Sequence, residues 1–149
     1  MAKVDFPIET VLEIFMEAAE IAMKKVHLNI QQDIKKMLNL GGPGPPSAVG
    51  RPPHKQSGNL SRSWQYGGLT IRRGRADMTG VYKQARVGSA ADYAAALEYG
   101  YPPRNLKARP YIRPVVRSKK KHKLGDKIFA KEFKKAAKQR ANQLIRSTI

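Results

Sequence analysis

Residues 41–60, GGPGPPSAVGRPPHKQSGNL, constrain the fold more than any other stretch, because half of them are proline or glycine. Proline has no backbone N–H and a fixed φ, so neither a long helix nor a central strand can pass through them. The regular elements must therefore lie on either side. The stretch has two interpretations: a flexible linker between two domains, or a shaped loop inside one domain.

The segment before this stretch, residues 7–40, predicts one long amphipathic helix. Pro7 suits a first helical turn, acidic residues gather toward the N-terminal half, and Lys35 and Lys36 lie near the end, which matches the helix dipole. Its apolar residues recur at spacings of three and four, as a core-packing helix requires. They are Val11, Ile14, Phe15, Ala18, Ile21, Ala22, Val26, Ile30, Ile34, Met37 and Leu38.

The segments after the stretch predict short elements. We expect Ser57 to be the N-cap of a short helix with Leu60 and Trp64 on one apolar face. Residues 69–87 predict a hairpin that turns near Gly74–Asp77, because apolar and polar residues alternate on both sides. The alanine-rich run 90–99 predicts a short helix that ends at Gly100.

The C-terminal part begins with a proline-rich run and continues as a helix. Residues 101–114 contain four prolines and cannot form one regular element. A basic helix is expected over 118–149, with an interruption at Gly125. The apolar positions of this helix include Phe129, Phe133 and Ala136.

These elements predict an α+β fold in a single domain, residues 1–149. It comprises a long N-terminal helix, an extended Pro/Gly loop, a small antiparallel sheet, a short helix and a basic C-terminal helix. Neither side of the Pro/Gly stretch can easily form a core alone, so we interpret residues 41–57 as an extended, partly rigid arm inside one domain.

Charge is distributed unevenly along the chain. The formal net charge is +18 and the isoelectric point is near 10.4. Residues 1–33 contain six acidic and three basic residues, whereas residues 100–149 contain sixteen basic residues and two acidic ones. Such an imbalance indicates a polyanionic or acidic partner, or serves solubility alone.

Residues for catalysis or cofactor binding are scarce, so we expect neither an enzyme nor a cofactor. His27, His54 and His122 are far apart, with no ligand at metal-binding spacing, and there is no cysteine. GGPGPP lacks the ending of a phosphate-binding loop, and its prolines remove the N–H groups that such a loop needs. No catalytic residue and no metal site is predicted. Lacking both an apolar signal segment and a membrane-spanning run, the protein is expected to be soluble and not secreted.

Four residues have both a functional and a packing interpretation. Glu98 is either a site acid or, more simply, an exposed or paired carboxylate. Trp64 either stacks on a ligand or packs in the core, which its spacing from Leu60 favours. Tyr93 and Tyr99 are most simply packing residues with a solvated hydroxyl.

Residues 113–140 form the most basic region and indicate possible contacts with DNA phosphates or with an acidic protein surface. Lys119, Lys120, Lys121 and Lys123 are its central group, and Arg113, Arg117, Lys127, Lys131, Lys134, Lys135 and Lys138 extend it. Phe129 and Phe133 are spaced as core residues rather than as a base-stacking platform. A solvated helix face is the simpler alternative.

Three short motifs in order resemble a family of small virion proteins of long-tailed phages and prophages, described as head–tail joining, neck or tail-completion proteins. A "tGxLrxS" start after a Pro-Gly loop is matched by Ser57–Ser63. A "YAxxxExG" box is matched by Tyr93, Ala94, Glu98 and Gly100, and an "aRPFlRPA" box by residues 108–115. The match spans about residues 41–116, with Tyr101 and the basic run KKKHK as departures from the pattern.

The resemblance implies a structural protein at the head–tail interface of the virion, assembled in the host cytoplasm. It implies a homo-oligomeric ring, which the six-fold symmetry of tails makes a hexamer, or several copies on a twelve-fold portal assembly. The ring would contact head-completion, tail-terminator or tail-tube proteins and genome DNA in the lumen. The acidic first helix of one copy would then meet the basic C-terminal half of the next. We expect Arg109 and Arg113 to pair with carboxylates of an adjacent subunit. The expected interface residues are Pro43, Pro45, Pro46, Arg51, Arg109, Tyr111 and Arg113. A nucleic-acid-binding protein and a tail-terminator or head-closure protein are the alternatives.

Overall fold

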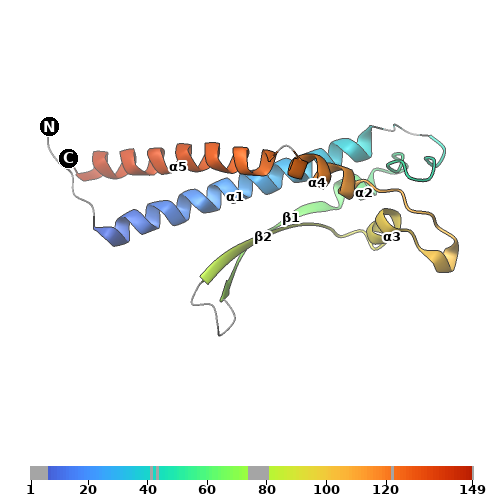
Figure 1. Ribbon diagram of the computed structural model, residues 1–149, viewed down its shortest axis with the longest axis horizontal. Coiled ribbons are helices and arrows are strands. Elements are labelled where there is room, and N and C mark those ends of the chain that lie inside the picture. The colour runs from blue at the N-terminus through green and yellow to red at the C-terminus, as the bar shows by residue number, and fades with distance from the viewer. Residues whose placement is uncertain (1–6, 41, 43, 74–80, 122, 149) are drawn as a thin grey trace. The chain divides into compact units, whose positions relative to one another are not determined.

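The structure is a computed structural model that describes residues 7–40, 42, 44–73, 81–121 and 123–148. The fold is α+β and mostly helical, as predicted. The helices are α1 (Ile8–Asn39), α2 (Asn59–Arg62), α3 (Ala94–Tyr99), α4 (Ile112–Lys121) and α5 (Leu124–Thr148). A 3-10 turn, η1, covers Pro102–Arg104. The strands β1 (Trp64–Arg73) and β2 (Val81–Ser89) pair in a two-stranded antiparallel sheet (Figure 1).

The chain forms two compact units, each assembled from segments that are distant in sequence. Unit 1 comprises Met1–Val26, Leu69–Gln84 and Gly125–Ile149. Unit 2 comprises His27–Gly68 and Ala85–Leu124.

Within unit 1 the N-terminal half of α1 runs antiparallel to α5 (Figure 1). Small side chains lie at this crossing, because Ala18, Ala22 and Ala136 are buried. Phe133 stacks on Phe15 with ring centroids 5.6 Å apart. The apolar faces of the two helices therefore bury each other.

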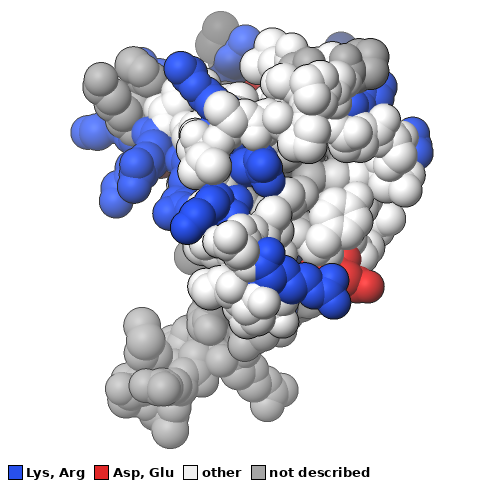
Figure 2. All heavy atoms as spheres, turned by 90° about the vertical axis from the view of Figure 1, so that its right-hand side faces the viewer, with Lys and Arg blue, Asp and Glu red and all other residues white. Residues whose placement is uncertain are grey.

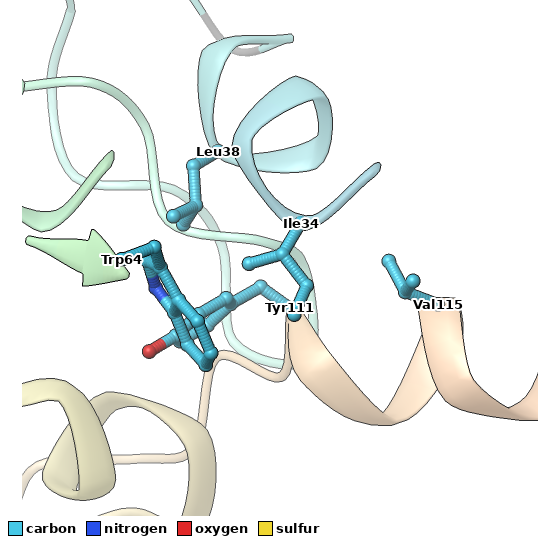
Figure 3. Packing of buried hydrophobic residues seen from close by; sticks show 5 residues of the cluster. All are labelled: Ile34, Leu38, Trp64, Tyr111 and Val115. Atoms are coloured by element: carbon cyan, nitrogen blue, oxygen red, sulfur yellow. The ribbon is translucent and has the colours of Figure 1, made fainter. Parts of the chain in front are cut away.

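Unit 2 has its own core, shown in Figure 3. It consists of Ile34, Leu38, Trp64, Tyr111 and Val115. Trp64 and Tyr111 meet edge to face, with ring centroids 6.0 Å apart. The core interpretation of Trp64 is thus confirmed, although this residue begins β1 rather than lying on a helix.

The N-cap prediction at Ser57 is wrong by one residue. Gly58 precedes α2 with φ +77°, and a Cβ there would lie only 3.0 Å from an Arg62 nitrogen. The Ser57 hydroxyl instead accepts a hydrogen bond from the Asn59 N–H at 3.3 Å. A left-handed backbone suits glycine, which has no side chain to clash.

The basic C-terminal helix predicted over 118–149 is present as two helices. The chain turns between them at Lys123, which has φ +48°, whereas Gly125 lies inside the first turn of α5. The glycine therefore did not mark the interruption, which lies at the left-handed backbone of Lys123.

Candidate functional site

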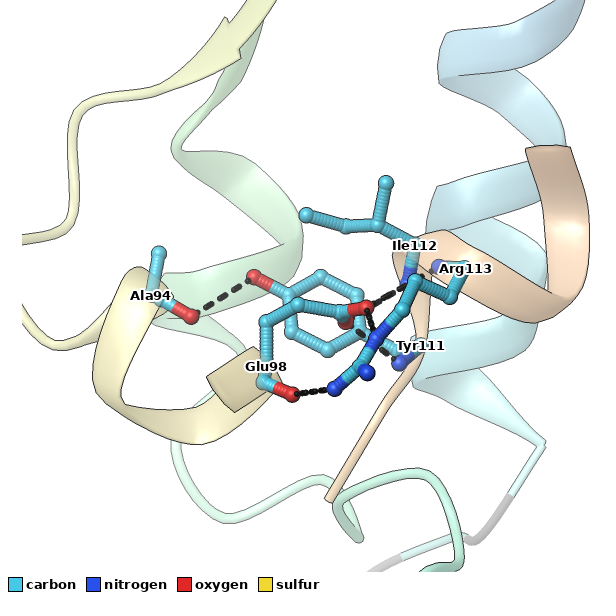
Figure 4. Close-up of polar contacts among 5 residues, drawn as sticks. All are labelled: Ala94, Glu98, Tyr111, Ile112 and Arg113. Atoms are coloured by element: carbon cyan, nitrogen blue, oxygen red, sulfur yellow. Dashed lines mark hydrogen bonds and ion pairs between the residues drawn. The ribbon is translucent and has the colours of Figure 1, made fainter. Parts of the chain in front are cut away.

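The two motif-like boxes, residues 93–100 and 108–115, meet at the carboxylate of Glu98 (Figure 4). Glu98 Oε2 accepts hydrogen bonds from the N–H groups of Tyr111 (2.8 Å) and Ile112 (2.9 Å). Its Oε1 accepts from the N–H and the Nε of Arg113, both at 3.0 Å. We call Glu98, Tyr111, Ile112 and Arg113 the Glu98 cluster.

This carboxylate has a structural reason to be there, because α4 begins at Ile112. The first N–H groups of a helix have no partner inside the helix, and the positive end of the helix dipole favours an anion. Glu98 supplies both the acceptors and the charge from another element, α3. Its side chain is fully buried. Of the two simpler interpretations, the paired carboxylate is therefore right and the exposed one is wrong.

The pKa of Glu98 reflects this environment. Burial alone would raise it, but hydrogen bonds from the N–H groups of Ile112, Tyr111 and Arg113 and from the Arg113 side chain outweigh burial and lower the pKa. The carboxylate stays ionised, and four donors occupy its oxygens. This arrangement anchors the start of a helix and leaves no free oxygen for proton transfer.

Arg113 extends the contact back to α3. Its Nη2 donates to the Glu98 backbone carbonyl at 2.6 Å, and its guanidinium lies 5.2 Å from the Tyr99 ring centroid. Tyr93 and Tyr99 are 47% and 71% exposed, so neither is a core residue, although the Tyr99 ring packs against Arg113. Arg113 was expected to pair with another subunit, but its carboxylate partner is in its own chain.

Tyr111 was expected at a subunit interface, and this expectation is wrong because its side chain has no exposed surface. Its hydroxyl donates a long hydrogen bond of 3.4 Å to the carbonyl of Ala94. Burial, together with the nearby charge of Glu98, raises the pKa of Tyr111 to about 12. The ring fills the core of unit 2 beneath the Glu98 cluster.

Gly100 lets the two boxes approach. It has φ +84°, and a Cβ there would lie 2.9 Å from the Leu106 carbonyl oxygen and 3.2 Å from the Ala108 nitrogen. Tyr101 and Leu106 form an antiparallel bridge just beyond it. The glycine of the first box is thus explained by close contact with the backbone that leads into the second.

The Pro/Gly loop folds back on unit 2 and is not the extended arm expected over 41–57. Gly50 N–H donates to the Ala108 carbonyl (3.0 Å), and Arg109 Nε donates to the Ser47 carbonyl (2.9 Å). Within the loop, His54 Nδ1 donates to Pro45 O and Gln56 Nε2 donates to Gly44 O. These bonds give the backbone carbonyls local partners, which an extended arm would leave to solvent.

The remaining residues expected at a subunit interface differ in how exposed they are. Pro45, Pro46 and Arg51 are exposed on this loop. Pro43 lies outside the described residues. Arg109 is half-buried and bonded to the loop within its own chain, contrary to the expected pairing with an adjacent subunit.

The central lysine group does not act as one surface. Lys119 is only 13% exposed and pairs with Asp33 at 2.6 Å and with the Asn29 side chain, whereas Lys120 and Lys123 are exposed. Lys121 lies at the end of α4, and its side chain is outside the described part of the chain. The acidic–basic pairing expected between copies also occurs within the chain: Glu17 pairs with Arg140 at 2.9 Å in unit 1.

A longer basic surface runs along α5. Lys127, Lys131, Lys134 and Lys138 recur at spacings of four, three and four, so they share one face. All four are exposed, and none has an ion-pair partner among the described residues. We call these residues the α5 lysine stripe. Basic side chains also prevail over acidic ones on the face in Figure 2.

Among the described residues, no group of three or more His, Cys, Asp or Glu is arranged to hold a metal ion. None of the described helices is long and apolar enough to cross a membrane. Comparisons of the chain with protein-family models, with curated proteins and with solved structures found no match.

Proposed function

We propose that the protein is a structural, non-enzymatic subunit of a phage neck that joins or completes the tail at the head–tail interface and works as part of a homo-oligomeric ring. The observation that carries the proposal is the Glu98 cluster. Two of the three motifs that carry the resemblance, the boxes 93–100 and 108–115, hold each other through Glu98 and Arg113. The spacing of the boxes thus serves one structural unit rather than a catalytic centre.

Exposed apolar side chains support an assembly role. Ile8, Leu12 and Met16 on α1 and Val49 on the Pro/Gly loop are all more than half exposed. Clusters of exposed apolar residues are typical of protein–protein contact surfaces. The proteins that the ring contacts decide which neck layer it occupies. They also decide between this function and the alternative of a tail-terminator or head-closure protein.

Disruption of the gene in the phage that encodes it tests the proposal. We expect separate filled heads and tails in electron micrographs of the lysate, with attachment restored by the gene in trans. The purified protein should form a ring in native mass spectrometry. A monomeric protein that is absent from disrupted virions would contradict the proposal.

The α5 lysine stripe favours a second candidate function, binding of nucleic acid through its phosphates. Residues four apart on a helix are about 6 Å apart along its axis, close to the separation of successive phosphates along a strand. The salt dependence of duplex binding, measured by fluorescence anisotropy, tests this. Lys131→Gln with Lys134→Gln should lower the log–log salt slope by about two, because each phosphate contact contributes about 0.9.

A matched control is Lys24→Gln with Lys25→Gln, which removes two exposed lysines from α1. This control should leave the salt slope unchanged. Equal slopes for both variants, or no binding at physiological salt, would remove the second candidate.

A further inference from the structure

Unit 2 contains a partly enclosed cavity of about 170 Å³ between the Pro/Gly loop, α2 and α3. Its apolar walls come from Leu38, Pro46, Pro53, Leu60 and Leu97. An apolar cavity of about 150 Å³ binds a benzene molecule, so this one has room for one large apolar side chain. The folded-back loop therefore forms one wall of a receptor pocket.

The cavity also has one buried polar group that lacks a hydrogen-bond partner. The hydroxyl of Ser47 lines it, and that side chain is 5% exposed without a hydrogen-bond partner. A buried polar group without a partner is unusual and indicates a missing one. Lys55 and Arg109 also line the cavity, and no Asp or Glu is among the described residues that do so. The surroundings favour an apolar side chain flanked by carboxylates.

The N-terminal part of α1 carries apolar side chains flanked by carboxylates. Ile8, Leu12 and Met16 are 71%, 57% and 54% exposed and recur every four residues, so they form one apolar stripe. Glu9 and Glu13 lie beside it, are exposed, and form no ion pair with a described residue. We call these five residues the α1 stripe.

We propose that the cavity of unit 2 receives the α1 stripe of a second copy of this chain, with an apolar side chain of the stripe in the cavity and Glu9 and Glu13 facing Lys55 and Arg109. Different surfaces of the two copies then meet. Such a heterologous contact leaves one free surface of each kind, so further copies can add until the rotation between them closes a ring, whereas an isologous contact would stop at a dimer. This inference rests on the proposed ring function.

Cysteine cross-linking tests the contact directly, because the chain has no cysteine of its own. Leu12→Cys and Ser57→Cys variants of the full chain are mixed and oxidised. Ser57 is chosen because it is exposed at the rim of the cavity. We expect the mixed Leu12→Cys/Ser57→Cys dimer to exceed both homodimers. Lys24→Cys, an exposed position on another face of α1, is the matched control for Leu12→Cys and should give no such excess.

Charge exchange gives a second measurement. Glu13→Lys should weaken self-association in sedimentation experiments, and adding Lys55→Glu should restore part of it. Leu12→Ser should weaken association by about tenfold to a hundredfold, the value of burying one leucine side chain. Val116→Ser, which removes an exposed apolar side chain from α4, should have little effect.

The cross-linking overturns this inference if no mixed product exceeds the control, or if a Leu12→Cys homodimer is the main product. If rings still form when Leu12→Ser and Glu13→Lys are combined, the ring function stands and this contact is wrong. If the wild-type chain is monomeric and absent from virions, both proposals fail.

Discussion

At the residue scale, Glu98 holds α3 and the start of α4 together, because its carboxylate accepts four hydrogen bonds from residues 13 to 15 positions ahead. A buried carboxylate is costly unless every oxygen is bonded. Here three of the donors are backbone N–H groups that would otherwise have no partner at the helix start. The hydrogen bonds to these N–H groups thus offset the free-energy cost of burying the carboxylate.

Glu98→Gln should lower the free energy of unfolding at pH 7 by about 3 kcal/mol, because a buried charged acceptor is lost while its donors remain. The folded-state pKa lies below the usual value of 4.5, so the wild-type contribution is present above that pH. It is lost as the pH falls from there through the lower folded-state pKa. Urea unfolding over a pH series measures this.

Glu9→Gln, an exposed carboxylate on α1, is the control and should follow the wild type. Wild-type and Glu98→Gln curves that stay parallel through the acid range would contradict the role given to Glu98.

Tyr111 should ionise well above the ordinary value of a tyrosine, because burial and the charge of Glu98 raise its pKa to about 12. Its contribution to stability is complete below the ordinary value of 10.0 and is lost as the pH rises toward about 12. Ultraviolet titration of tyrosinate should show one late step that disappears in Tyr111→Phe. The exposed Tyr93→Phe should keep the late step.

At the element scale, the Gly50 N–H and the Arg109 side chain tie the Pro/Gly loop to residues 108 and 109, so loss of that side chain should loosen the loop. Arg109→Gln removes the bond to the Ser47 carbonyl and should increase tryptic cleavage after Lys55 several-fold, because cleavage requires local opening. Limited proteolysis followed by mass spectrometry measures the rate. Arg104→Gln, an exposed arginine on η1, should cleave like the wild type, and equal rates in both variants would show that Arg109 does not hold the loop.

At the scale of the whole molecule, the net charge of +18 should make stability depend on salt. Unpaired lysines such as the α5 lysine stripe repel one another in the folded chain, and salt screens that repulsion. The Tm in calorimetry should therefore rise from low to moderate sodium chloride. Lys131→Glu with Lys134→Glu should reduce the gain. A Tm that falls with added salt would instead show that attractive pairs such as Glu17–Arg140 dominate.

Local patterns in the chain were sufficient to predict the α+β class, α1, the hairpin and the short helix before Gly100. Each of these depends on neighbours in sequence: apolar spacing of three and four, alternation, or a residue without a side chain. The predicted ends of the elements were less accurate where contact with a distant segment determines them. Trp64 begins β1 because Ser63 pairs with Ser89 and Ala90, which no local pattern records.

Only the folded chain shows which residues pair with one another. The presence of Glu98, Arg109, Tyr111 and Arg113 in ordered motifs was visible in the sequence, but exposure and pairing were not. Tyr111 and Arg113 were expected at a surface between subunits, yet one fills the core and the other bonds to Glu98. A carboxylate takes whichever donors packing brings within about 3 Å, and that proximity arises only when α3 and α4 fold against the core that contains Trp64 and Leu38.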